Sequence, residues 1–207
     1  MTNHPSPPPD DERALAERAR AGDAEAFARL VRPITVPLLV LLRRCGAAAF
    51  GGDCDEEDLL QVVLAKAWRL LPGFTFGGPG SFHRWLAAIA RAAVLDRRKY
   101  RAARRRGPDI HVESVDSAGA DGFFVPADVT SIPRAAARRE EARRVETALA
   151  RLPETQREVI ERHLLLGDSL GEIAAALGIR KNAVWERLHR GLASVRESLG
   201  PRTATPA

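Results

Sequence analysis

The spacing of apolar residues predicts helices along much of the chain. From Leu60 to Leu71 they recur at i, i+3, i+4, i+7, i+8 and i+11, which is one face of a helix. The acidic run 55–58 precedes this stripe and suits the positive end of a helix dipole, and Pro72 ends it. A second stripe begins at Phe82, so two consecutive helices are expected here.

Upstream and downstream segments extend this helical pattern. Residues 24–42 are compatible with a helix that Pro33 and Pro37 interrupt or bend. Between residues 107 and 133 the periodicity is lost, and this stretch is too long for an ordinary connection inside one compact domain. The prediction is an all-α fold of two small helical domains joined by a flexible linker, the C-terminal one a helix-turn-helix. The expected divisions are a disordered tail over 1–10, a domain over 11–106, a linker over 107–134, a domain over 135–199 and a tail over 200–207.

The most informative stretch is 169–192. It opens with the capping-box sequence Ser169-Leu170-Gly171-Glu172, and Gly178 then permits the sharp turn between two helices. This pattern predicts a helix-turn-helix whose second helix suits the major groove, and an ordinary helical hairpin is the alternative. With Val184 and Leu188 facing inward, the side chains left outside are Arg180, Lys181, Asn182, Trp185, Glu186, Arg187 and Arg190.

A second concentration of charge follows a glycine-rich loop. Phe74 and Phe76 lie on that loop, and aromatic side chains beside arginines suit single-stranded bases and backbone. A solvated helix face would explain the charges equally well, and the spacing of Phe82 and Trp85 makes them core candidates. The basic residues are Arg91, Arg97, Arg98, Lys99, Arg101, Arg104, Arg105 and Arg106.

Composition narrows the function classes. The chain has 207 residues, 32 basic against 27 acidic side chains and a net charge of +5. Arginine dominates the basic residues, which suits phosphate recognition, although codon bias in a GC-rich genome explains it as well. Enzymatic motifs are missing and the His and Cys residues do not cluster, so we expect no catalytic residues, no metal and no cofactor, and reduced thiols at Cys45 and Cys54. The longest apolar stretch, residues 36–42, cannot span a membrane, and a cytoplasmic protein is expected.

Two motifs resemble the extracytoplasmic-function sigma factors of bacterial RNA polymerase. Asp58-Leu59-Leu60-Gln61, Ala67-Trp68, Trp85-Leu86 and Ile89-Ala90-Arg91 resemble their region 2. Leu152-Pro153-Glu154-Thr155-Gln156-Arg157-Glu158-Val159, with Leu177-Gly178-Ile179 after it, resembles region 4.

This resemblance implies a non-catalytic subunit that binds core RNA polymerase and promoter DNA, with an anti-sigma factor as a further partner. It implies polymerase docking through Asp58, Leu59, Leu60 and Gln61. It implies recognition and melting of the −10 element through Phe74, Phe76, Ser81, Arg91, Arg97, Arg98, Lys99 and Arg101. The −35 element would be read by the second helix of the helix-turn-helix, through its outward side chains between Arg180 and Arg190. The two domains would be ordered relative to each other only on the partner.

Several positions depart from the family pattern. Val62 stands where an acid is usual, and Ala92 replaces a common asparagine. Arg180 takes a usual Ser or Thr capping position, and Trp185 and Glu186 replace a small or basic pair. Promoter preference therefore cannot be carried over.

Two rival hypotheses remain open at this point. One is a helix-turn-helix regulator that binds DNA without polymerase, which leaves residues 58–98 unexplained. The other is a regulatory protein with sigma-like architecture and degraded promoter recognition.

Overall fold

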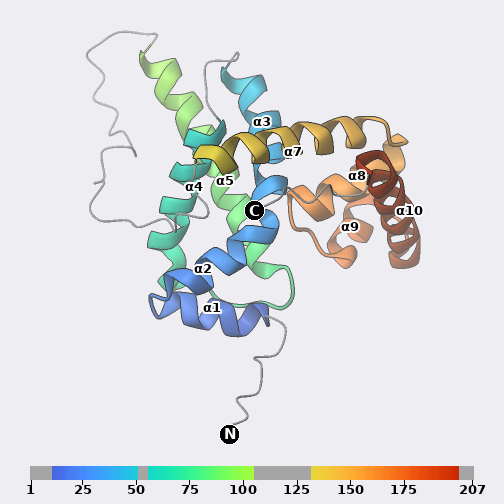
Figure 1. The fold of residues 1–207 in the computed structure, drawn as a ribbon. Coiled ribbons are helices and arrows are strands. Elements are labelled where there is room, and N and C mark those ends of the chain that lie inside the picture. Colours follow the sequence, from blue (N-terminus) through green and yellow to red (C-terminus); the bar gives the residue numbers. More distant parts are fainter. Residues whose placement is uncertain (1–10, 51–55, 105–131, 201–207) are drawn as a thin grey trace, which may run out of the picture.

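The computed structural model describes residues 11–50, 56–104 and 132–200, and all its regular elements within these ranges are helical (Figure 1). The N-terminal part contains α1 (Glu12–Arg20), α2 (Ala24–Val31), η1 (Arg32–Ile34), α3 (Thr35–Phe50), α4 (Glu56–Leu70), η2 (Leu71–Gly73) and α5 (Ser81–Arg104). The C-terminal part contains α7 (Ile132–Ala150), α8 (Glu154–Ile160), the π-helical segment η4 (Glu161–Leu165), α9 (Leu170–Leu177) and α10 (Lys181–Leu199). The predicted all-α fold is confirmed. The predicted tail over 1–10 and most of the predicted linker lie outside the described residues.

Local sequence signals account for several helix boundaries. Asp23 caps α2 by accepting a hydrogen bond from the backbone of Ala26, at 3.0 Å, and Arg18 pairs with the same carboxylate. These contacts hold the pKa of Asp23 below its ordinary value. Pro33 lies in the 3₁₀ turn η1 between α2 and α3, so the predicted interruption is there. The helix α7 already begins within the last residues assigned to the linker, where Pro133 fits the first turn of a helix.

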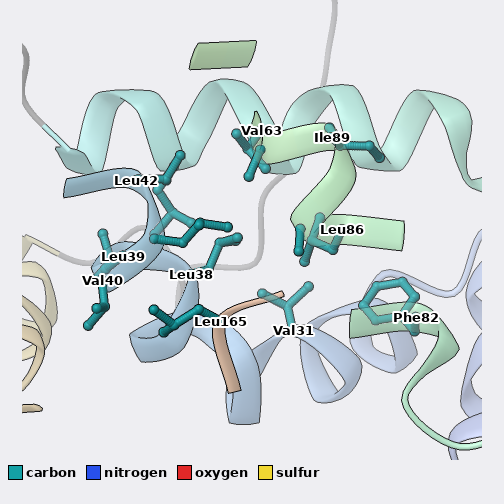
Figure 2. Packing of buried hydrophobic residues seen from close by; sticks show 14 of the residues in the cluster. Val31, Leu38, Leu39, Val40, Leu42, Val63, Phe82, Leu86, Ile89 and Leu165 are labelled. Atoms are coloured by element: carbon teal, nitrogen blue, oxygen red, sulfur yellow. The ribbon is translucent and has the colours of Figure 1, made fainter. Parts of the chain in front are cut away.

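The helix α3 lies at the centre of the molecule. Five consecutive residues in it, Leu38 to Leu42, are buried, which means that it is covered on every side. Its neighbours are α4 and α5 from the N-terminal part and α7 and η4 from the C-terminal part. Figure 2 shows Leu165 of η4 beside Val31 and the α3 side chains. Thus the two parts share one hydrophobic core.

Ion pairs reinforce this contact between the two parts. Arg138 of α7 pairs with the buried Glu57 of α4, with Nη2 and Oε2 3.0 Å apart. On α3, Arg43 pairs with Glu146 at 3.2 Å, and its neighbour Arg44 pairs with an acid of η4. The expectation that the parts are ordered only on a partner is therefore not met in this structure, because the apolar run Leu38 to Leu42 of α3 is buried on every side and both parts cover it.

A close contact at the start of α5 tightens the same interface. A Cβ atom on Gly167 would lie 2.7 Å from the backbone nitrogen of Arg84. Beside it, His83 is largely buried, and its Nε2 has no hydrogen-bond partner among the residues that the structure describes. Burial first, and His163 second, lower the pKa of His83 to about 4. Because the neutral imidazole is favoured there, His83 contributes stability above about pH 6.5, and this is lost as the pH falls towards 4.

Two predicted contact residues belong to the core instead of the surface. Leu60 is 0% exposed and Leu59 is 3% exposed. Leu60 lies on the same helix face as Val63, Leu64 and Ala67, which all pack against the rest of the domain. A surface position for Leu59 and Leu60 is therefore wrong in this structure, since the apolar stripe that predicts the helix also buries them.

None of the described helices is both long and apolar enough to cross a bilayer. Cys45 is a free thiol, and Cys54 lies outside the described residues.

The tight contact at Gly167 generates a prediction. Gly167 and Gly178 both have positive φ, of 74° and 64°, but a Cβ atom on Gly178 would meet nothing within 4 Å. Gly178→Ala is expected to lower the free energy of unfolding by about 1–2 kcal/mol through backbone strain alone. Gly167→Ala is expected to lower it by about 1–3 kcal/mol more, because the new methyl group collides with α5. Urea denaturation measures both, and equal losses would contradict the packing of this turn on α5.

Candidate nucleic-acid and polymerase interfaces

The helix-turn-helix is formed by α9, a sharp turn and α10. Ser169 and Glu172 make a reciprocal capping box, with the Ser169 amide donating to Glu172 at 2.7 Å. Bonds from Ser169 and the nearby Arg84 guanidinium hold the pKa of Glu172 below its ordinary value. Gly178 then adopts the left-handed backbone that the sharp turn requires. The predicted elements at 169–192 are therefore present with the predicted caps.

One side of α10 is fixed by packing. Val184, Leu188, Gly191 and Val195 are buried at a spacing of four, three and four residues. Gly191 sits against Ile160 of α8, where a Cβ atom would lie 2.4 Å from Cδ1. This close approach leaves the opposite side of α10 facing outward. Arg187 is half-buried at its edge, and the exposed predicted residues are Arg180, Lys181, Asn182, Trp185, Glu186 and Arg190.

Side-chain pairs shape the outward side of α10. The Trp185 ring is stacked on the His189 ring with centroids 3.9 Å apart, and Trp185 is 52% exposed. Arg190 pairs with Glu186 at 3.1 Å, which offsets the acidic charge that would otherwise repel phosphate. The sequence analysis missed His189. Its spacing of four residues from Trp185 was the available signal.

The glycine-rich loop before α5 exposes less aromatic surface than predicted. Phe74 is only 4% exposed and packs against Phe82 and Trp85, with ring centroids 5.7 and 5.1 Å away. It is therefore a core residue, and the expectation that it is free to stack on a base is wrong in this structure. Phe76 is half-buried. Ser81 is buried and accepts a hydrogen bond from the Gly77 amide at 3.3 Å, so it shapes the loop.

The basic end of α5 is largely accessible. Arg91, Arg98 and Lys99 are exposed and Arg97 is half-buried. The exposed Leu95 lies between Arg91 and Arg98 along this helix. The side chain of Arg101 lies outside the described residues, as do Arg105 and Arg106.

The outward side of α4 carries the remaining predicted polymerase contacts. Asp58 is exposed, and Gln61 is half-buried with the neighbouring Val62. In Figure 1, α4 and α10 lie on opposite sides of the molecule, with α3 and α7 between them. Among the residues that the structure describes, no group of three or more His, Cys, Asp or Glu side chains could hold a metal ion.

The sequence analysis also missed Glu12, at the start of α1. Its carboxylate accepts hydrogen bonds from the Gly80 and Phe82 amides, at 2.7 and 3.0 Å. No local pattern links residues so far apart in the chain.

Two stretches of the chain match known family models. Residues 41–106 match the family model of Sigma-70 region 2, and residues 142–195 match that of Sigma-70, region 4. The two matches cover α4, α5 and the helix-turn-helix, in the predicted order.

Relatives that align over most of their own length are also sigma factors. ECF RNA polymerase sigma factor SigL of Mycobacterium tuberculosis is 31% identical over 86% of this chain and 94% of its own length. RNA polymerase sigma factor CnrH of Cupriavidus metallidurans is 30% identical over 91% of this chain and 94% of its own length. A solved structure of CnrH in complex with the cytosolic domain of CnrY is 27% identical and covers 90% of this chain and 95% of that chain, with a TM-score of 0.42. The chain belongs to the extracytoplasmic-function sigma factors, non-catalytic subunits that direct RNA polymerase to specific promoters.

Proposed function

We propose that the outward side of α10 reads the −35 element of the promoter. The observation that supports this most strongly is the packing of Gly191 and the other buried α10 residues, which turns the opposite, polar side outward. In helix-turn-helix proteins the N-terminal residues of the second helix contact base edges. Arg180, Lys181 and Asn182 occupy that end and can donate to guanine or pair with adenine.

The unusual residues of α10 suit specific base contacts. The Trp185 ring, fixed by its stacking on His189, offers an apolar surface for a thymine methyl group. Glu186 can accept a hydrogen bond from cytosine N4, and its pairing with Arg190 reduces repulsion by nearby phosphates. These departures from the family pattern support an altered promoter preference. They argue against the hypothesis of degraded promoter recognition.

For the −10 element, we propose the exposed tip of the loop before α5 together with the basic end of α5. Phe76 is the remaining aromatic side chain of the loop with accessible surface. Along α5, Arg91 lies about 15 Å and Arg98 about 26 Å from the helix start at Ser81, so they and Lys99 can neutralise phosphates further along the same strand. Base stacking with charge neutralisation is how proteins hold single strands. For the polymerase, the accessible candidates are Asp58 and Gln61, with Val62 beside them.

These assignments require the two parts of the chain to separate. The nominal −35 and −10 positions are about 25 base pairs apart, which is about 85 Å of B-DNA. A compact chain of this length has a radius of gyration of about 17 Å and is about 45 Å across. The packed arrangement around α3 therefore cannot place both surfaces on the promoter at once.

Two further proposals rest on family membership. They are a cytoplasmic location, where polymerase and promoter DNA are found, and regulation by an anti-sigma factor. The alternative, a helix-turn-helix regulator that acts without polymerase, is not favoured, because it leaves the match of residues 41–106 to region 2 without a role.

The proposed function predicts that promoter-specific transcription can be reconstituted from the purified chain and core polymerase. The purified chain is expected to co-elute with bacterial core RNA polymerase and to produce run-off transcripts with defined start sites from genomic fragments. Core polymerase alone is the control and should give no such starts. A folded chain that does not associate with its cognate core would contradict the proposal.

The assignment of α10 predicts an unequal effect of two arginine substitutions. Arg187→Ala is expected to weaken promoter use by about 1–3 kcal/mol if this side chain reaches a base or phosphate. Arg196→Ala is the matched control, because Arg196 is exposed on the last turn of the same helix, away from its N-terminal end. Run-off titration of holoenzyme against promoter measures both. Equal effects would remove Arg187 from the site.

A further inference from the structure

Helix α1 contacts both ends of the loop that precedes α5. At the far end of the loop, Glu12 Oε2 accepts a hydrogen bond from the Gly80 amide at 2.7 Å, and Oε1 accepts one from the Phe82 amide at 3.0 Å. At the near end, Arg20 Nη2 donates to the carbonyl oxygen of Pro72 at 3.2 Å. Figure 1 shows the loop passing close to α1 and α2.

These contacts fix the spacing of the loop ends. Glu12 and Arg20 are eight residues apart on one helix, which corresponds to about 12 Å of helix length. The rigid helix thereby holds Pro72 and Gly80 at a set separation, and Phe74, buried against Phe82, anchors the chain between them. The stretch that remains, residues 75–79, is exposed except at Phe76 and Gly78, which are half-buried.

This stretch needs external support because of its composition. Gly78 and Gly80 adopt positive φ, of 108° and 77°, and a glycine-rich segment loses more conformational entropy on ordering than other sequences. Its internal bonds are few: the Gly77 amide donates to Ser81 Oγ, and the Ser81 amide donates to the Gly78 carbonyl. A loop held in its binding conformation before the ligand arrives avoids part of the ordering cost of binding.

We propose that α1 holds the −10 recognition loop in its binding conformation and that Glu12 is the main positioning residue of this helix. This inference rests on the proposed role of the loop in −10 recognition. It extends the promoter-reading unit beyond residues 41–106, which match region 2, to a helix that precedes them.

The chemistry explains why a carboxylate is needed at Glu12. Two backbone N–H groups point to it from the first turn of α5 and the residue before it, and each takes one oxygen. The positive end of the α5 dipole favours the negative charge as well. An amide offers one good acceptor and a donor that faces an N–H group, so glutamine can satisfy only part of this arrangement.

The test compares holoenzymes that contain Glu12→Ala, Glu12→Gln or the matched control Glu17→Gln. Glu17 also lies on α1, but it is exposed and pairs with Arg13 of the same helix, at 3.0 Å. A promoter recovered by run-off transcription is used in its natural form, with substitutions in the −10 element, and with substitutions in the −35 element. The discrimination ratio at each element is measured.

Glu12→Ala is expected to reduce −10 discrimination about tenfold, because two charge-assisted hydrogen bonds are lost. It should leave −35 discrimination and core binding unchanged. Glu12→Gln should be intermediate and Glu17→Gln should match the wild type. Amide hydrogen exchange in the free protein should be fastest at Gly80 and Phe82 in Glu12→Ala, intermediate in Glu12→Gln and unchanged in Glu17→Gln.

Three results would overturn the inference. One is unchanged −10 discrimination in Glu12→Ala, and another is an equal loss at both promoter elements, which a general loss of stability would cause. The third is unchanged exchange at the two amides. If the wild-type holoenzyme itself showed no −10 dependence, the proposed role of the loop would be wrong. That outcome differs from the three results above, which would contradict the positioning role of α1 alone.

Discussion

The burial of α3 on every side is the constraint on which the rest of the structure depends. A surface helix has a polar side, but α3 carries five consecutive buried residues, Leu38 to Leu42, which leave no side of that stretch exposed. The helices α4 and α5 cover one part of its surface, and α7 and η4 cover another. Arg43 and Arg44, at the end of this buried run, then pair with acids of α7 and η4, which sets the orientation of the C-terminal part.

Because both parts of the chain pack on α3, this shared core determines which surfaces are accessible in the free protein. It leaves the outward sides of α10 and α4 accessible, so either could meet a partner without unfolding. It keeps α10 close to the loop before α5, and under the proposed assignment of these two surfaces one compact body cannot reach both promoter elements. Opening would expose the surface of α3 beneath α7 and η4 and leave Glu57 without Arg138, so under the same assignment polymerase and promoter contacts would supply that free energy.

Helical periodicity predicted what depends on local sequence. It indicated α4, α5, the capping box of α9 and the outward side of α10, because a period of 3.6 residues and a cap are properties of neighbouring residues. It could not separate core from contact surface where the two overlap, as at Leu60 and Phe74. It also could not find pairs formed by distant residues. Glu12 with Gly80 and Arg138 with Glu57 depend on how helices pack, which no local pattern records.

Under the proposed assignment of the two promoter surfaces, the N-terminal and C-terminal parts are packed together in the free protein and separate on the promoter. Energy transfer between dyes on Ala21→Cys and Ser198→Cys, in a chain with Cys45 and Cys54 replaced by serine, measures this directly, because both sites are exposed ends of α1 and α10. We expect high transfer in the free protein and a large decrease in the promoter-bound holoenzyme. Transfer that stays equally high in a transcribing complex would contradict this expectation.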